Sequence, residues 1–177
     1  MAVAVAPVTG RALRRGARNA SGSEAVAGSF QRVLIASEGR PVPDEAIAEA
    51  ARLAARSGAH VHVLAVARIY GTPFGMTTPG LLPTKKEWAE RHEVVASAVR
   101  RLKKRGIKAD GQVVGTRNAA KRICAEVSMR DYEAVVMSCD PDRNRFVGDL
   151  MWTQEPQRVR RRARVPVFLV GAAAADG

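Results

Sequence analysis

The stretch from residue 134 to residue 170 constrains the fold of this chain more than any other. A short apolar run, Ala134–Met137, ends in a polar loop, a basic helical pattern follows, and a second apolar run covers Val165–Val170. Strand, loop, helix and strand in this order form half of a parallel α/β sheet. Such sheets bind ligands in the loops that leave the carboxyl ends of their strands. We therefore expect a ligand site in the loop Ser138–Met151.

The rest of the chain repeats this alternation. Continuous apolar runs at 31–37, 60–66 and 132–137 predict buried strands, and a more polar run at 108–115 predicts a strand at the sheet edge. Helical patterns lie between these runs, with Asp44, Thr84 and Asn118 as expected N-caps and Glu87 completing a capping box. The sequence thus predicts a doubly wound, five-stranded parallel α/β sheet with four helices in three layers.

Composition limits the class of partner. The chain has 177 residues and a net charge of +12, but 23 Arg stand against 6 Lys, a bias that GC-rich coding also produces. Aromatic residues make up only 5%, so bases would find few rings to stack on, and we do not expect nucleic acid as the main ligand. Cys124 and Cys139 cannot form a disulfide framework, which favours the cytoplasm. No apolar run has the length of a membrane span.

The ends of the chain differ in composition from its centre. Residues 1–29 are basic and show no helical or strand period, which favours a disordered tail over an organellar transit peptide. We expect one domain over residues 30–171 and a short tail at 172–177. Within the domain, His60 and His62 share one strand face, but no third ligand lies nearby in the sequence, so no metal site is predicted. Cys124 is predicted to be a small core residue without a redox role.

The order of these elements resembles the universal stress protein family over about 140 residues. The resemblance rests on Val33–Gly39 before an Ala-rich helix, His60–Val66, Glu133–Ser138, and the pair Arg158-Val159 six residues before Val165-Pro166-Val167-Phe168-Leu169-Val170. It implies the strand order 3-2-1-4-5, with a crevice between the first and fourth strands. Many members bind ATP there through a Gly-x2-Gly-x9-Gly-Ser/Thr loop, whose backbone N–H groups contact the phosphates.

This chain departs from that loop. Ser138 and Pro141 stand at the first two glycines, Thr153 and Gln154 at the final Gly-Ser pair, and only Gly148 remains between. Pro141 has no N–H to donate. At the end of the first strand, Glu38 replaces the family's Asp. The candidate crevice residues are Ser37, Glu38, Gly39, Ser138, Cys139, Asp140, Arg143, Arg145, Gly148, Thr153 and Gln154.

These departures define the functional expectations. We expect a non-enzymatic stress-response or regulatory protein that does not bind ATP in the family's usual way. One alternative is a basic module for an acidic protein partner, such as a transporter, or for nucleic acid. Another is binding of ATP or AMP through Arg143 and Arg145, although these side chains could instead pair with neighbouring Asp in solvent. The resemblance also implies a homodimer through the edge residues Val165, Val167, Phe168, Leu169 and Val170.

Overall fold

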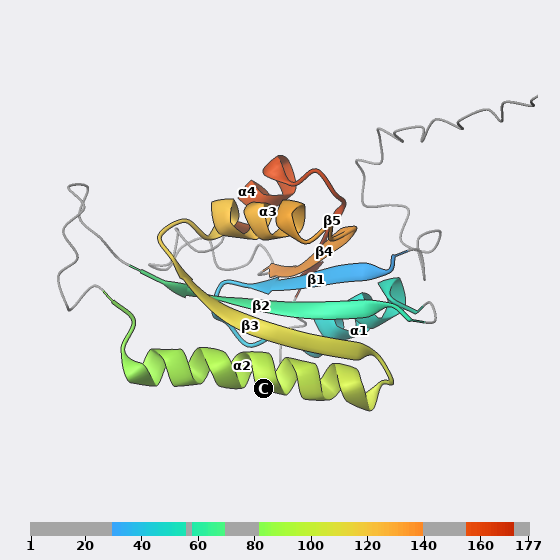
Figure 1. Ribbon diagram of the computed structural model, residues 1–177, viewed down its shortest axis with the longest axis horizontal. Helices are drawn as coiled ribbons and strands as arrows, with labels where there is room; N and C mark the ends of the chain where they lie inside the picture. Colours follow the sequence, from blue (N-terminus) through green and yellow to red (C-terminus); the bar gives the residue numbers. More distant parts are fainter. Residues whose placement is uncertain (1–29, 56–57, 70–81, 140–154, 172–177) are drawn as a thin grey trace, which may run out of the picture.

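A parallel sheet between two helical layers forms the protein (Figure 1). The computed structural model describes residues 30–55, 58–69, 82–139 and 155–171, so the predicted tails and most of the predicted ligand loop lie outside the described residues. The described elements are β1 (Arg32–Ser37), α1 (Asp44–Leu53), β2 (His60–Arg68), α2 (Lys85–Lys104), β3 (Lys108–Thr116), α3 (Ala119–Met129), β4 (Ala134–Cys139), α4 (Glu155–Arg162) and β5 (Val167–Gly171).

The predicted architecture is confirmed. All pairings are parallel and the strand order is β3-β2-β1-β4-β5. Alternate residues of the strands point to opposite faces, which divides the core in two. Val33 and Val63 pack under α1 and α2, whereas Leu34 and Leu64 pack under α3 and α4. The two helical layers lie on opposite sides of the sheet in Figure 1. No helix within the described residues has the length and apolarity needed to cross a bilayer.

Several predicted boundaries differ from the structure, and three of the differences have a clear cause. The last strand begins at Val167 and not at Val165, because Pro166 has no N–H for the ladder and contributes only its carbonyl, 3.0 Å from the backbone nitrogen of Val135. The fourth strand begins at Ala134, because the N–H of Tyr132 closes the end of α3. Asp44 is the first residue of α1 and makes no cap. Its carboxylate instead binds Arg101 of α2 at 2.8 Å.

The other two predicted helix starts are confirmed. Asn118 accepts the backbone N–H of Lys121 at 2.9 Å, and the Thr84 hydroxyl accepts the N–H of Glu87 at 3.2 Å. In return, the Glu87 carboxylate accepts the N–H of Thr84 at 2.6 Å, which completes the capping box. These bonds, first to the backbone and then to the hydroxyl of Thr84, lower the pKa of Glu87.

Replacement of Thr84 by alanine should lower the free energy of unfolding by about 1 kcal/mol, because the first turn of α2 loses its acceptor. Glu87 should make this cost depend on pH. Since its pKa is lowered on folding, the stabilisation is present above the carboxyl's unfolded value and is lost as the pH falls through the folded value. Urea unfolding of both proteins at neutral pH and at about pH 3 checks this. An equal cost at both values would contradict the hydrogen bond from the Thr84 hydroxyl to the Glu87 carboxylate.

Candidate functional site

The sheet opens between β1 and β4 at their carboxyl ends. Their register stops at the pair Ile35 and Val136, whereas β1 stays paired with β2 up to Ser37 and β4 stays paired with β5 up to Cys139. After β1 the chain enters α1 on one face, and the helix after β4 lies on the other face. A parallel sheet forms its ligand crevice at such a reversal. The opening therefore lies where the sequence predicts it.

In the turn after β1, polar groups form hydrogen bonds with one another. The Ser37 hydroxyl donates to the carbonyl of Arg40 at 2.6 Å and accepts the N–H of Gly39 at 3.1 Å. Gly39 has φ +102°, a conformation that side chains disfavour. Arg91 of α2 donates to the Gly39 carbonyl, and a Cβ on Gly39 would lie 2.5 Å from its Nε. Ser37 and Gly39 thus fix the turn, and the half-buried Glu38 brings a carboxylate to this end of β1.

The fourth strand supplies the opposite side of the opening. Ser138 and Cys139 are half-buried and close β4, opposite Val170 and Gly171 of β5. The structure thus places five predicted site residues at the ends of the two strands that part. The other predicted residues lie outside the described part of the chain: Asp140, Arg143, Arg145, Gly148, Thr153 and Gln154.

Glu155, at the same carboxyl end of the sheet, is a residue that the sequence reasoning missed. It begins α4, only 3% of its side chain is exposed, and one oxygen accepts the N–H of Ala120 in the first turn of α3 at 3.0 Å. The other oxygen binds Arg158 at 2.9 Å and Arg68, at the end of β2, at 3.4 Å. One sequence feature could have indicated this role: an acidic residue at the start of a helix, three positions before an arginine. Its carboxylate takes a backbone donor that an anionic ligand could otherwise use.

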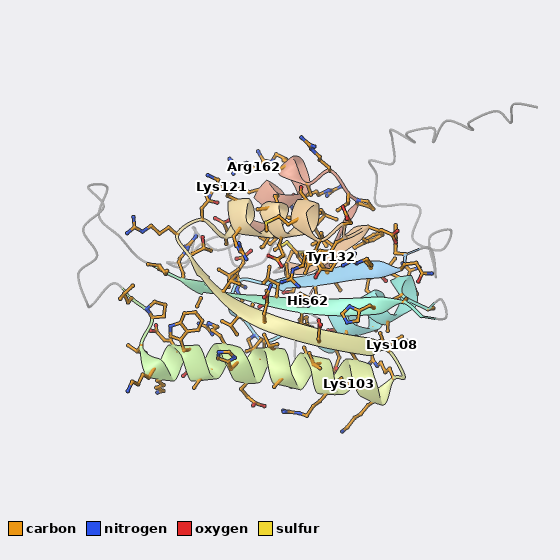
Figure 2. The ribbon with its side chains drawn as sticks, viewed as in Figure 1. His62, Lys103, Lys108, Lys121, Tyr132 and Arg162 are labelled. Atoms are coloured by element: carbon orange, nitrogen blue, oxygen red, sulfur yellow. The ribbon has the colours of Figure 1, made fainter. Side chains whose placement is uncertain are left out.

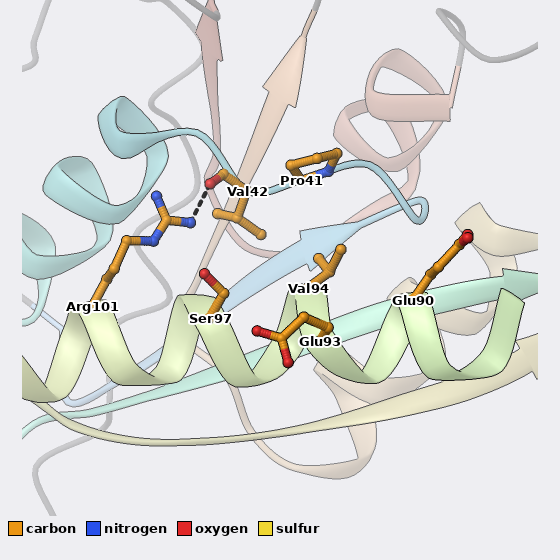
Figure 3. A pocket seen from close by; sticks show the side chains of 7 residues that line it. All are labelled: Pro41, Val42, Glu90, Glu93, Val94, Ser97 and Arg101. Carbon is orange, nitrogen blue, oxygen red and sulfur yellow. Dashed lines mark hydrogen bonds between the residues drawn. The ribbon is translucent and has the colours of Figure 1, made fainter. Parts of the chain in front are cut away.

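A separate hollow of about 330 Å³ lies between the segment before α1 and the middle of α2 (Figure 3). Arg101 donates to the Val42 carbonyl at one end of it. Glu90 and Glu93 belong to its lining, together with Pro41, Val94 and Ser97. None of the predicted site residues contributes to this hollow. Its two carboxylates disfavour an anionic ligand, so we keep the opening between β1 and β4 as the candidate site.

The paired histidines have a neighbour that the sequence did not reveal. Asp110 of β3 hydrogen-bonds to Nδ1 of the buried His62 and lies 3.6 Å from Nε2 of His60. His62 also stacks on Tyr132, with ring centroids 5.9 Å apart (Figure 2). The sequence did not indicate this contact, because it is the register of β2 and β3 that places Asp110 beside the two histidines. Even so, no three His, Cys, Asp or Glu among the described residues are arranged to hold a metal ion.

Cys124 lies on α3 against the core, as predicted. Burial raises the pKa of its thiol, while the nearby Arg162 opposes this shift. In the Cys139→Ser variant, Cys124 is the one remaining thiol of the chain. We expect iodoacetamide to label it more slowly at pH 8 in the folded protein than in urea, with a rate that still rises above pH 9 because thiolate forms late. Equal rates in the two states would contradict a protected thiol.

The predicted dimer residues lie at one edge of the sheet. Val167, Phe168, Leu169 and Val170 belong to β5 and are half-buried, whereas Val165 precedes the strand. Phe168 packs edge-to-face on Phe30, with centroids 6.2 Å apart. Because β5 pairs only with β4, its other side is a free strand edge among the described strands.

Comparison with known proteins supports the same fold. A universal stress protein of Archaeoglobus fulgidus superposes with a TM-score of 0.59 at 17% identity, covering 79% of this chain and 93% of that one. A Burkholderia pseudomallei member gives 0.57 at 21%, covering 80% and 96%. An Arabidopsis thaliana member, crystallised with AMP bound, gives 0.54 at 16%, covering 81% and 93%. At these levels of sequence identity, the structural similarity establishes the fold alone.

Among curated protein sequences, none matches this chain. The sequence pattern of the universal stress protein family, however, matches residues 29–171, which is most of the chain. The strand order, the parting of β1 from β4 and the solved relatives agree with this match. The chain belongs to the universal stress protein family.

Proposed function

We propose that the chain is a non-enzymatic regulatory protein whose crevice binds an adenine mononucleotide in preference to ATP. Solved relatives of the same fold carry AMP, cAMP or dAMP. The observation that carries the preference is the buried carboxylate of Glu155, which already occupies the N–H of Ala120. Glu38 adds a second carboxylate at the end of β1. Each further phosphate of a ligand would add negative charge near the Glu38 carboxylate.

The ligand loop supports the same preference from the sequence. Ser138 and Pro141 stand where the family's ATP loop has its first two glycines, and Pro141 has no N–H. A triphosphate needs several closely approaching backbone donors, whereas a single phosphate needs few. Arg143 and Arg145 follow within the same loop and could donate to one phosphate through their guanidinium groups. A nucleoside monophosphate is therefore the ligand that this loop sequence accommodates best.

Isothermal titration calorimetry with AMP and ATP tests the proposal. We expect AMP to bind at least about tenfold more tightly than ATP, which corresponds to about 1.4 kcal/mol. In the Glu38→Gln variant the difference in affinity between AMP and ATP should become smaller, because one carboxylate no longer repels the additional phosphates of ATP. Equal or tighter binding of ATP would overturn the preference, and binding of neither nucleotide would overturn the assigned ligand class. Release of ADP or AMP from ATP, at a rate proportional to protein concentration, would contradict a non-enzymatic role.

We also propose that two copies associate through β5. Its outer edge and its half-buried apolar side chains support this pairing, since a free strand edge tends to bind another strand. The variant Leu169→Lys, once circular dichroism shows that it folds, should shift the molecule towards the monomer in light scattering, because it adds a charge to the strand that would pair. Wild-type protein with a strictly monomeric mass would contradict the pairing.

A further inference from the structure

The outer side of α3 and α4 carries a strongly basic surface. The side chains of its members are all exposed, and within the described ranges no hydrogen bond or salt bridge of these side chains is found. We call it the α4 basic face, and it consists of Lys121, Arg160, Arg161, Arg162 and Arg164. In Figure 2, Lys121 and Arg162 lie on the α3–α4 side of the sheet, opposite α2. Helices α3 and α4 pack against one another, so the cations of both helices lie on the same side of the molecule.

The acidic residues of these two helices do not neutralise this surface. Glu126 and Glu155 are both directed inwards and buried, and each is already bound by arginines. In the opposite helical layer, Arg52, Arg100 and Arg101 pair with nearby carboxylates, whereas no ion pair within the described residues is found for the exposed Lys103, Lys104 and Arg105 at the end of α2. An arginine-rich composition explains how many cations the chain has. It does not explain why the two helices expose cations and no carboxylate.

Helix stability does not explain the surface either. Arg160, Arg161 and Arg162 lie in the last turn of α4, where the helix dipole favours cations. Lys121, however, lies in the first turn of α3, which contains no acidic residue. A cation there is disfavoured by the same dipole. Arg164 lies beyond the end of α4. A binding partner accounts for all five cations together.

We propose that the α4 basic face binds an acidic segment of another protein, a stretch rich in Asp and Glu. The arginines on these helices already bind carboxylates, as Arg158 binds Glu155 at 2.9 Å and Arg130 binds Glu126 at 2.7 Å. Guanidinium groups suit carboxylates because they can donate two parallel hydrogen bonds. Neither helix carries an aromatic ring, which nucleic acid single strands use for stacking. An exposed large apolar side chain is found there only at Met129, the last residue of α3, which gives a bilayer little to take up.

Fluorescence anisotropy with a labelled Glu/Asp peptide of about twelve residues, about 40 Å when extended, tests the proposal on the full chain. The peptide with Gln and Asn at the acidic positions is the negative probe. The variant Arg160→Gln/Arg161→Gln/Arg162→Gln should bind the acidic peptide about tenfold more weakly, since several surface ion pairs are lost. The matched control Lys103→Gln/Lys104→Gln/Arg105→Gln removes the same charge from the end of α2 and should lose less than about threefold.

Each outcome decides the proposal. Equal losses in the two triple variants would show an effect of net charge alone and would overturn the assigned face. Tighter binding of a DNA duplex or of anionic lipid vesicles than of the peptide, at the same salt concentration, would overturn the partner class. Should the α4 variant fail to fold by circular dichroism, Lys121→Gln/Arg164→Gln takes its place. These two positions belong to the same basic face, one in the first turn of α3 and one just after α4, and an unchanged affinity in this variant would also contradict the proposal.

Discussion

Replacing Glu126 with alanine is expected to lower the free energy of unfolding by about 3–5 kcal/mol, because it removes one partner of a buried charge network. Only 2% of the Glu126 side chain is exposed. Its oxygens accept from Gln112 of β3 at 2.8 Å, from Arg122 at 2.9 Å and from Arg130 at 2.7 Å. Without the carboxylate, the amide of Gln112 and the partly buried Arg122 lose their acceptor between α3 and the sheet.

The arginine at the rim of this network provides the control. Half of the Arg130 side chain is exposed, so Arg130→Ala should cost no more than about 1 kcal/mol, since solvent can replace its interaction. Urea unfolding of both variants, followed by circular dichroism, gives the comparison. A cost for Glu126→Ala no larger than that for Arg130→Ala would show that the buried carboxylate is not the centre of the network.

The second large effect is expected at Glu155, where alanine should lower the free energy of unfolding by about 2–4 kcal/mol. The N–H of Ala120 loses its acceptor at a buried position, and the ion pairs to Arg158 and Arg68 disappear. Because these contacts join α3, α4 and the end of β2, the change should also loosen one side of the crevice. Glu155→Gln keeps an oxygen for the Ala120 N–H and should cost less than alanine.

An exposed glutamate calibrates this result. Glu93 pairs with Arg100 on the surface of α2, with 67% of its side chain exposed, and Glu93→Ala should change stability by less than about 1 kcal/mol. Both variants can be measured by the same urea titration. If Glu155→Ala and Glu93→Ala have the same cost, Glu155 does not hold the three elements together.

The fold could be predicted because its signals are local. Buried parallel strands form continuous apolar runs such as Val33–Ala36, and the alternation with helices restricts the topology. The caps at Thr84 and Asn118 depend on residues three positions apart, so the sequence alone predicts them. Asp44 was misassigned because its partner, Arg101, lies on another helix. The start of the last strand was misplaced although Pro166, which lacks an N–H, is visible in the sequence.

The candidate site was less predictable, since its contacts join distant parts of the chain. The ends of β1 and β4 were identified from strand order, and both lie at the opening. The role of Glu155 could not be predicted, because it depends on Ala120 and Arg68, which are 35 and 87 positions away. The same applies to Asp110, which reaches His62 across 48 positions. Sequence patterns indicate which residues share a face, but they do not indicate which side chain of a neighbouring strand completes a cluster.

The central claim is that an adenine mononucleotide occupies the opening between β1 and β4. Titration of ¹⁵N-labelled protein with AMP, followed by amide chemical shifts, tests it most directly. We predict saturable shifts at Glu38 and Gly39 after β1 and at Ser138 and Cys139 at the end of β4, with unchanged amides in α2 around Ser97. Shifts confined to the hollow at Val42 and Ser97, or the absence of saturable shifts at both strand ends, would contradict the account.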